Sequence, residues 1–163
     1  MKAFTHLDNE GRVKMVDVSA KVPTLREAVA EGFVEVSAEV QRLIRDKAIP
    51  KGDVFTVAKI AGIQAAKETA RWIPLCHPTA IQSVDIAFTL ESGGVRVGAT
   101  VKAQDKTGVE MEALCSVTAA CLTLYDMCKA VDKTMSIGSI RLLRKSGGRS
   151  GTWTNPLAQK IPE

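Results

Sequence analysis

A single imidazole in a loop bracketed by prolines is the first candidate for chemistry, in the segment Pro74-Leu75-Cys76-His77-Pro78. Pro78 disfavours helical geometry at the preceding residue, so we expect His77 in extended backbone where a helix ends. An imidazole held in a defined direction can transfer protons near neutral pH. A buried histidine with a purely structural hydrogen bond is the alternative.

Two carboxylates of one predicted helix are the next candidates. Thr107 and Glu110 have the spacing of a capping box, which gives Glu110 a structural role and leaves Glu112 without one. Asp126 falls in the last turns, where the helix dipole disfavours a negative charge and favours Lys129. A surface ion pair between Asp126 and Lys129, three residues apart, is the structural alternative.

The spacing of these carboxylates bears on assembly. Glu112 and Asp126 are 14 residues apart, which places them on nearly the same helix face but about 21 Å apart along the axis. One nucleotide-sized ligand does not reach both within one copy. If both serve catalysis, we expect sites shared between subunits of a homo-oligomer.

Two basic segments are suited to phosphate groups. Lys51 stands just before a helix that Asp53 can cap, and free helix amides together with a lysine can bind phosphate. Residues 145–151, KSGGRSG, combine glycines, hydroxyls and basic side chains, beginning with Lys145, in a pattern that can form a backbone nest for an anion. An exposed turn and a flexible glycine-rich tail are the respective alternatives.

Composition narrows the classes of partner. The chain has 163 residues and a formal net charge of +4, with Lys and Arg spread along its length. It contains one Tyr, two Trp and four Phe, too few for the base-stacking surface of a nucleic-acid binder. The sequence therefore favours an anionic small molecule and predicts no nucleic-acid partner.

Cysteine spacing and hydropathy predict a cytoplasmic protein. Cys76, Cys115, Cys121 and Cys128 show no C-x-x-C spacing, which indicates reduced thiols. We find no signal-type apolar run, and no segment that approaches the roughly 18 apolar residues of a membrane span. We expect no metal site, because Cys76 and His77 diverge in an extended segment and His6 lies in the N-terminal tail.

Hydrophobic periodicity predicts one domain, residues 1–163, with mobile ends at 1–12 and 153–163. We expect helices at 24–48, 53–72 and 108–131, and strands at 13–19, 81–90, 95–103 and 137–143. Residues 91–94, ESGG, read as the turn of a hairpin. This alternation predicts an α+β, ferredoxin-like sandwich, an antiparallel sheet with helices packed on one face.

Taken together, the motifs resemble a known family over nearly the whole chain and in the same order. They are MVDVSAK (15–21), KGDVF (51–55), AGIQAAK (61–67), IPLCHP (73–78), KTGVEMEAL (106–114), YDMCKAV (125–131) and KSGG (145–148). This series is similar to that of molybdenum cofactor biosynthesis protein C, the family of cyclic pyranopterin monophosphate synthases.

The resemblance implies a fold, an assembly and a reaction. It implies a ferredoxin-like subunit in a homohexamer, a trimer of dimers with active sites at the dimer interface. The substrate would be a cyclised dihydroguanosine triphosphate made from GTP. The enzyme, a lyase, would rearrange it to cyclic pyranopterin monophosphate and release diphosphate.

The resemblance also implies roles for individual residues. Asp126 would be the catalytic acid/base residue, with Lys51 and Lys129 beside it. Substrate would be bound by Leu75, Cys76, His77, Met111, Glu112 and Lys145. A site that draws Lys51 and Asp126 from different subunits is one arrangement to test.

The implied chemistry suits these residue types. Opening an imidazole ring and forming a pterin needs repeated proton transfers, which a carboxylate, a histidine and lysines of lowered pKa can perform. Closing a cyclic phosphate needs charge neutralisation by lysines. No redox cofactor is expected, and Mg²⁺ bound to the substrate phosphates stays open. A non-catalytic nucleotide-binding regulatory module is the alternative function.

Overall fold

A computed structural model describes residues 10–158 of the chain. Its strands form one antiparallel sheet in the order β2-β3-β1-β4-β5. The strands are β1 (Thr24–Glu35), β2 (Ile81–Glu91), β3 (Gly94–Asp105), β4 (Ser136–Ser146) and β5 (Trp153–Thr154). The helices are α1 (Ala38–Arg45), α2 (Val54–Lys67), α3 (Thr69–Trp72) and α4 (Glu110–Cys128).

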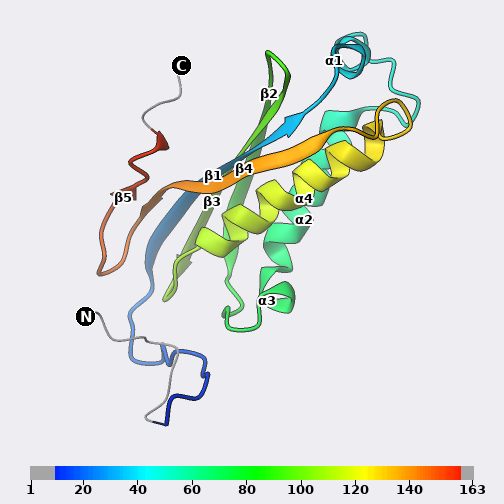
Figure 1. The fold of residues 1–163 in the computed structure, drawn as a ribbon. Helices are drawn as coiled ribbons and strands as arrows, with labels where there is room; N and C mark the ends of the chain where they lie inside the picture. Colours follow the sequence, from blue (N-terminus) through cyan, green and yellow to red (C-terminus); the bar gives the residue numbers. More distant parts are fainter. Residues whose placement is uncertain (1–9, 159–163) are drawn as a thin grey trace.

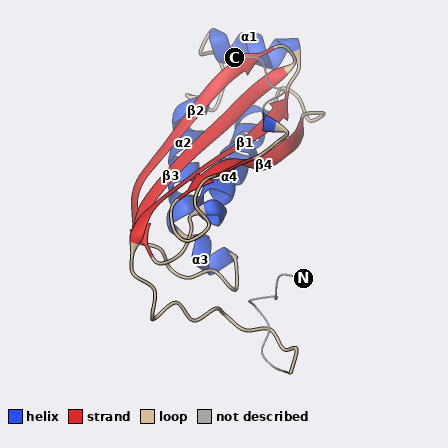
Figure 2. Ribbon diagram, turned by 90° about the vertical axis from the view of Figure 1, so that its left-hand side faces the viewer, coloured by secondary structure: helices blue, strands red, loops and turns tan. Residues whose placement is uncertain are grey.

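The two long helices cover one face of this sheet. α2 and α4 run side by side and pack against the strands (Figure 1), and the strands lie in front of them in the view turned by 90° (Figure 2). The order β1, α1–α2, β2, β3, α4, β4 is the split βαβ arrangement of ferredoxin-like domains. The predicted fold class is confirmed.

The helix predicted at 24–48 is wrong over its first half. Residues 24–35 form β1, the central strand, which pairs with β3 on one side and β4 on the other. Only Ala38–Arg45 is helical, and Ser37 caps it. Leu25 in the first half of the predicted helix is 65% exposed. Pairing with strands far along the chain overrides the local pattern here.

Smaller differences affect the other elements. Residues 13–19 form no strand beyond an isolated bridge at Val13. The helix predicted at 53–72 is divided at Glu68 into α2 and α3, and Asp53 caps α2 as expected. The hairpin, the helix at 108–131 and the strand at 137–143 are confirmed, with shifted ends.

The C-terminal end of the described chain is paired with the sheet. Residues 1–9 and 159–163 lie outside the described residues, so the predicted mobility of 1–12 and 153–163 stays a prediction. Trp153 and Thr154 pair with Lys145 and Arg144 as the edge strand β5. Asn155 then donates its backbone N–H to the Leu143 carbonyl over 2.7 Å, which holds the segment after β5 against β4.

α4 is the one helix of residues 10–158 that is long and apolar enough, by length and composition alone, to cross a membrane. However, 61% of its apolar stretch is buried inside the fold, where α4 packs against the sheet and α2. A Cβ at Gly62 of α2 would lie 2.9 Å from the Ser116 carbonyl oxygen, so the two helices are in close contact. α4 is thus placed as a core helix.

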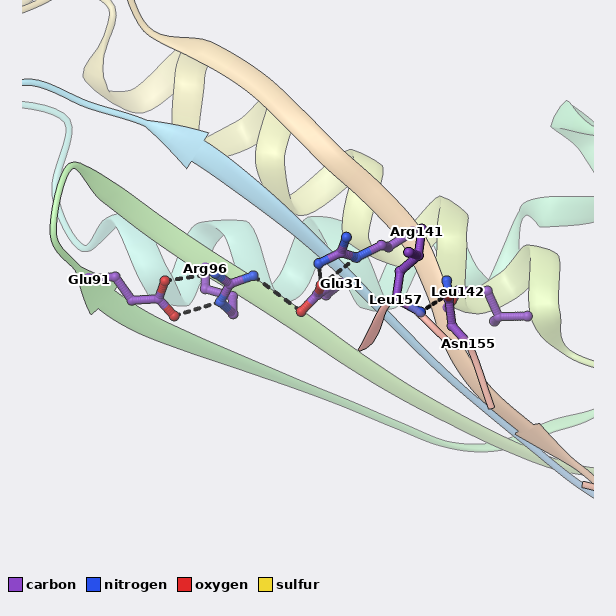
Figure 3. Close-up of polar contacts among 7 residues, drawn as sticks. All are labelled: Glu31, Glu91, Arg96, Arg141, Leu142, Asn155 and Leu157. Carbon is purple, nitrogen blue, oxygen red and sulfur yellow. Dashed lines mark hydrogen bonds and ion pairs between the residues drawn. The ribbon is translucent and has the colours of Figure 1, made fainter. Parts of the chain in front are cut away.

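A buried carboxylate stabilises the sheet face away from the helices. Glu31 of β1 is 3% exposed and accepts hydrogen bonds from Arg96 of β3, at 3.2 Å, and Arg141 of β4, at 2.7 Å (Figure 3). Arg96 also donates two hydrogen bonds to the Glu91 carboxylate, from Nε at 2.6 Å and from Nη2 at 2.8 Å. These ion pairs join β2, β3, β1 and β4 across the strands.

Aromatic residues lie on three of the strands. Phe33 is in β1, Phe88 in β2 and Trp153 in β5. The Phe88 ring stacks on Phe55 of α2 at 4.8 Å, and Phe33 lies under the Arg96 guanidinium. Phe33 and Phe88 therefore both have partners within the fold.

Candidate active site

A cavity of about 430 Å³ opens beside the N-terminal end of α4. Its wall is made by four segments that are distant in sequence: residues 16–27 up to the start of β1, the loop between α3 and β2, residues 106–112 at the start of α4, and the end of β4 with the loop after it. A cavity of this size holds a small-molecule ligand.

The binding residues predicted from the sequence gather at this cavity. The loop between α3 and β2 and the first turn of α4 contribute most of them, and β4 contributes one. All six predicted positions line the wall: Leu75, Cys76, His77, Met111, Glu112 and Lys145. The sequence motifs that carry them are more than sixty positions apart at their extremes, so the fold is what assembles the site.

Glu112 is the buried acidic group of this wall. It is 3% exposed, and Thr79 Oγ1 donates a hydrogen bond to its Oε1 over 2.9 Å. Burial raises the pKa of Glu112 above its ordinary value, and the nearby carboxylates of Glu110 and Asp105 act in the same direction. Its own backbone N–H and the Thr79 hydroxyl lower the pKa and oppose that shift. The group is therefore suited to proton transfer closer to neutral pH than an exposed glutamate.

Cys76 faces the same cavity as a neutral thiol. Burial raises its pKa, and the negative charge of Glu112 raises it further. A thiolate, not a thiol, is the reactive nucleophile. Cys76 is therefore suited to packing against a ligand rather than to covalent catalysis.

The predicted capping box at the start of α4 is absent. The N-cap residue is Val109, and no side chain caps the helix. Glu110 instead accepts a hydrogen bond from Lys145 Nζ over 2.7 Å. Glu110 thus has a role in the cavity wall, where it positions the lysine that we expected to bind phosphate.

A glycine pair brings the backbone after β4 onto an arginine of β1. Gly147 and Gly148 have φ values of +97° and +68°, and a Cβ on Gly148 would overlap the Arg26 guanidinium. Arg26 donates to the carbonyls of Asp105 and Lys106, both at 3.2 Å, which fixes its direction. The glycines are required by this close approach.

Several cations of the cavity were missing from the predicted site. The wall also contains four basic residues that were not predicted as site residues: Lys21, Arg26, Lys106 and Arg149. Arg26 was missed because its segment was assigned to a helix. Arg149 lies within residues 145–151, KSGGRSG, the segment predicted to bind an anion, so this pattern did indicate part of the cavity wall. With Lys145, these basic side chains outnumber the carboxyl groups of the wall, which belong to Glu27, Glu110 and Glu112.

The three predicted catalytic residues meet at the other end of α4. Asp126 Oδ1 lies 2.7 Å from Lys129 Nζ, and its Oδ2 lies 2.9 Å from Lys51 Nζ. Lys51 Nζ also donates to the Asp126 carbonyl over 2.9 Å. The three side chains, which we call the lysine–aspartate cluster, are each about half exposed.

The charges within this cluster set its protonation. Hydrogen bonds from Lys129 and then Lys51 lower the pKa of Asp126 to about 2, so its carboxylate is ionised at neutral pH. Asp126 in turn raises the pKa of Lys129, which is opposite to the lowered lysine pKa that we expected. In this protomer the cluster is a pair of ammonium groups held by a carboxylate.

One expectation for Lys51 is therefore corrected. Asp53 accepts hydrogen bonds from the backbone N–H groups of Phe55 and Thr56, both at 3.1 Å, so the first amides of α2 are not free for phosphate. Lys51 points to Asp126 instead. Lys51 and Asp126 contact one another within one chain, and a site that takes these two residues from different subunits stays a prediction.

The two groups of predicted residues stay apart. Glu112 lies in the first turn of α4 and Asp126 in its last, with 14 residues between them, or about 21 Å along the axis. None of the three cluster residues lines the cavity. The spacing argument from the sequence holds in the fold.

Residues 10–158 contain no group of three or more His, Cys, Asp or Glu side chains arranged to hold a metal ion. The cysteines Cys76, Cys115, Cys121 and Cys128 are free thiols. His6 lies outside the described residues.

Known proteins with similar sequences identify the family. The MoaC family profile matches residues 15–148. The chain is 54% identical over 155 residues to the cyclic pyranopterin monophosphate synthase of Chloroflexus aurantiacus, covering 94% of this chain and 95% of that protein. It is 55% identical over 149 residues to the synthase of Desulfitobacterium hafniense, covering 91% of each. A molybdenum cofactor biosynthesis bifunctional protein of Chlorobaculum tepidum is 54% identical over 147 residues, 90% of this chain and 47% of that protein. The chain therefore belongs to the MoaC family, and it is an enzyme of molybdenum cofactor biosynthesis.

Proposed function

We propose that the cavity at the N-terminal end of α4 binds the cyclised dihydroguanosine triphosphate derived from GTP, and that the enzyme converts it to cyclic pyranopterin monophosphate and diphosphate. The convergence of Leu75, Cys76, His77, Met111, Glu112 and Lys145 on one cavity is the observation that supports this assignment. Relatives named cyclic pyranopterin monophosphate synthase support the reaction.

The cavity divides into a polar and a basic part. Glu112 and His77 lie on the side formed by α4 and the loop before β2, where a base and its ring nitrogens would be held. Arg26, Lys145 and the glycine pair lie on the side formed by β1 and β4, and their positive charge suits the triphosphate. The lysine–aspartate cluster supplies further ammonium groups for the charge that develops as the cyclic phosphate closes.

The active site is completed across two subunits. One cavity and one cluster lie at opposite ends of the same helix, too far apart for one substrate molecule to contact both. A second copy can place its lysine–aspartate cluster at the cavity of the first. By two-fold symmetry, the cluster of the first copy then lies at the cavity of the second. This supports the expected sites at dimer interfaces, and the homohexamer is proposed on the family resemblance. Free thiols support a cytoplasmic location.

Product formation by purified protein tests this function. Incubation with the cyclised triphosphate should release diphosphate and cyclic pyranopterin monophosphate together from the wild type. Asp126→Asn removes the charge that holds Lys51 and Lys129, and should lose both products while the oligomer stays intact in gel filtration. Tight binding of nucleotide with neither product, indifferent to Asp126→Asn, would instead indicate a regulatory module. Wild-type turnover by Asp126→Asn would remove that residue from the site.

A further inference from the structure

A hydroxyl group connects Glu112 to the loop that carries His77. Thr79 Oγ1 lies 2.9 Å from Glu112 Oε1 and 3.3 Å from the His77 carbonyl oxygen. Thr79 and Glu112 also line both the 430 Å³ cavity and a neighbouring cavity of about 360 Å³. We propose that Thr79 is a positioning residue, which holds the Glu112 carboxyl group toward the substrate and partners it in both of its protonation states. This rests on the proposed function of the cavity.

The hydroxyl can serve either form of Glu112 without moving. When Glu112 is ionised, Thr79 donates its hydrogen to the carboxylate, the stronger of its two possible acceptors. When Glu112 is protonated, its O–H donates to Thr79 Oγ1, and the threonine hydrogen turns to the His77 carbonyl. A hydroxyl both donates and accepts, so neither state leaves the buried carboxyl group without a partner.

The other groups around Glu112 do not take over this role. Among residues 10–158 no lysine, arginine or histidine forms an ion pair with its carboxylate; Lys145 is bound to Glu110, and Lys106 donates to the Ser19 carbonyl. The titratable or charged groups nearest to it share the two cavities: Cys76, His77, Lys106, Glu110 and Lys145 line the first, and Lys67, Glu68 and Arg71 line the second. Asp105 and Cys115 line neither cavity but interact electrostatically with Glu112. Glu110 and Asp105 raise the pKa of Glu112, whereas the Thr79 hydroxyl lowers it.

Thr79→Val and Thr79→Ser separate this role from packing. Valine has nearly the shape of threonine but no hydroxyl, whereas serine keeps the hydroxyl and loses a methyl group. Removing a hydrogen bond to an ionised group in Thr79→Val should move the Glu112 limb of the kcat/KM profile about one pH unit upward and lower kcat/KM about tenfold on that limb. Thr79→Ser should keep the wild-type profile.

A titration of the Glu112 carboxyl carbon by NMR supplies a readout that does not depend on turnover. Glu112→Gln identifies the resonance and the kinetic limb, and Thr89→Val, an exposed threonine of β2, is the matched control that should change neither. An unmoved Glu112 titration in folded Thr79→Val, or a Thr79→Ser that behaves like Thr79→Val, would overturn the proposal. If Thr79→Val does not fold, the pair Thr79→Ala and Thr79→Ser gives the same comparison. A wild type without turnover would overturn the proposed function, while the NMR titration would still decide the role of Thr79.

Discussion

Mixing two inactive variants tests whether one active site draws on two subunits. Glu112→Gln changes the cavity at one end of α4, and Asp126→Asn changes the lysine–aspartate cluster at the other. Both substitutions remove a negative charge and keep the side chain's shape. Each variant alone should therefore assemble normally and form no product.

The expected recovery follows from the separation of these residues. Glu112 and Asp126 are about 21 Å apart along α4, so under the proposed shared site a complete site takes the cavity from one protomer and the cluster from another. In an equimolar mixture with random assembly, about half of the cavities and about half of the clusters are intact. A site that needs one of each, from different chains, is intact in about one quarter of cases, whatever the number of dimers in the oligomer.

The assay compares the mixture with each variant and with the wild type. The chains are co-expressed or reassembled together, mixing is verified by native mass spectrometry, and product formation is measured per site. A second mixture, Lys51→Ala with Asp126→Asn, is the control. Because Lys51 and Asp126 contact one another within a single chain, at 2.9 Å, every cluster in that mixture carries one of the two lesions and no activity should return.

Two results would refute the reasoning. If verified mixed oligomers of Glu112→Gln and Asp126→Asn recover no activity, one active site does not combine Glu112 from one chain with Asp126 from another. Recovery in the control mixture would mean that Lys51 and Asp126 act from different chains, against the contact within this protomer.

Two further predictions concern the basic wall and the open face of the sheet. Gly148→Ala should raise KM because the new Cβ displaces Arg26; Gly151→Ala is the control, since that glycine also has a positive φ, +62°, but nothing within 4 Å of an added Cβ. Equal KM values in the two variants would contradict a role for Arg26 in substrate binding. Glu31→Gln should destabilise the fold by about 3 kcal/mol, the lower end for breaking a buried ion pair because its arginine partners are partly exposed, and lower the Tm by roughly 10 °C. Glu91→Gln, whose carboxylate is one-third exposed, should cost about 1 kcal/mol or less; equal losses in thermal unfolding would contradict this account of the Glu31 network.

The fold class could be predicted from the sequence, but the central strand could not. In β1, Leu25, Val29 and Phe33 recur every four residues, as apolar residues do in an amphipathic helix. The core-facing positions of this strand are filled by small residues, Ala28, Ala30 and Gly32, which give little hydrophobic signal. What makes the segment a strand is pairing with β3 and β4, whose residues follow it by more than fifty positions.

The candidate site was recovered where motifs are local and missed where contacts are distant. The IPLCHP and KTGVEMEAL motifs led to cavity residues because each lies in one short segment at the wall. The capping box failed since Glu110 binds Lys145, 35 positions away, instead of the helix amides. Thr79 carried no signal at all, because its function depends on a contact with Glu112, 33 positions further along.

The cavity residues and the lysine–aspartate cluster lie at opposite ends of α4, and because this helix is rigid, a site shared between subunits is the simplest way to bring them together. Closure within one protomer would require the two ends of this helix to approach one another, and a packed helix does not fold back. Val117 and Cys121, midway along it, are fully buried, and a Cβ on Gly32 of β1 would lie 2.7 Å from the Val117 side chain. With the middle of the helix fixed between the sheet and α2, the separation of Glu112 from Asp126 is built into the core. A substrate that needs both ends can then obtain them only from two copies of α4.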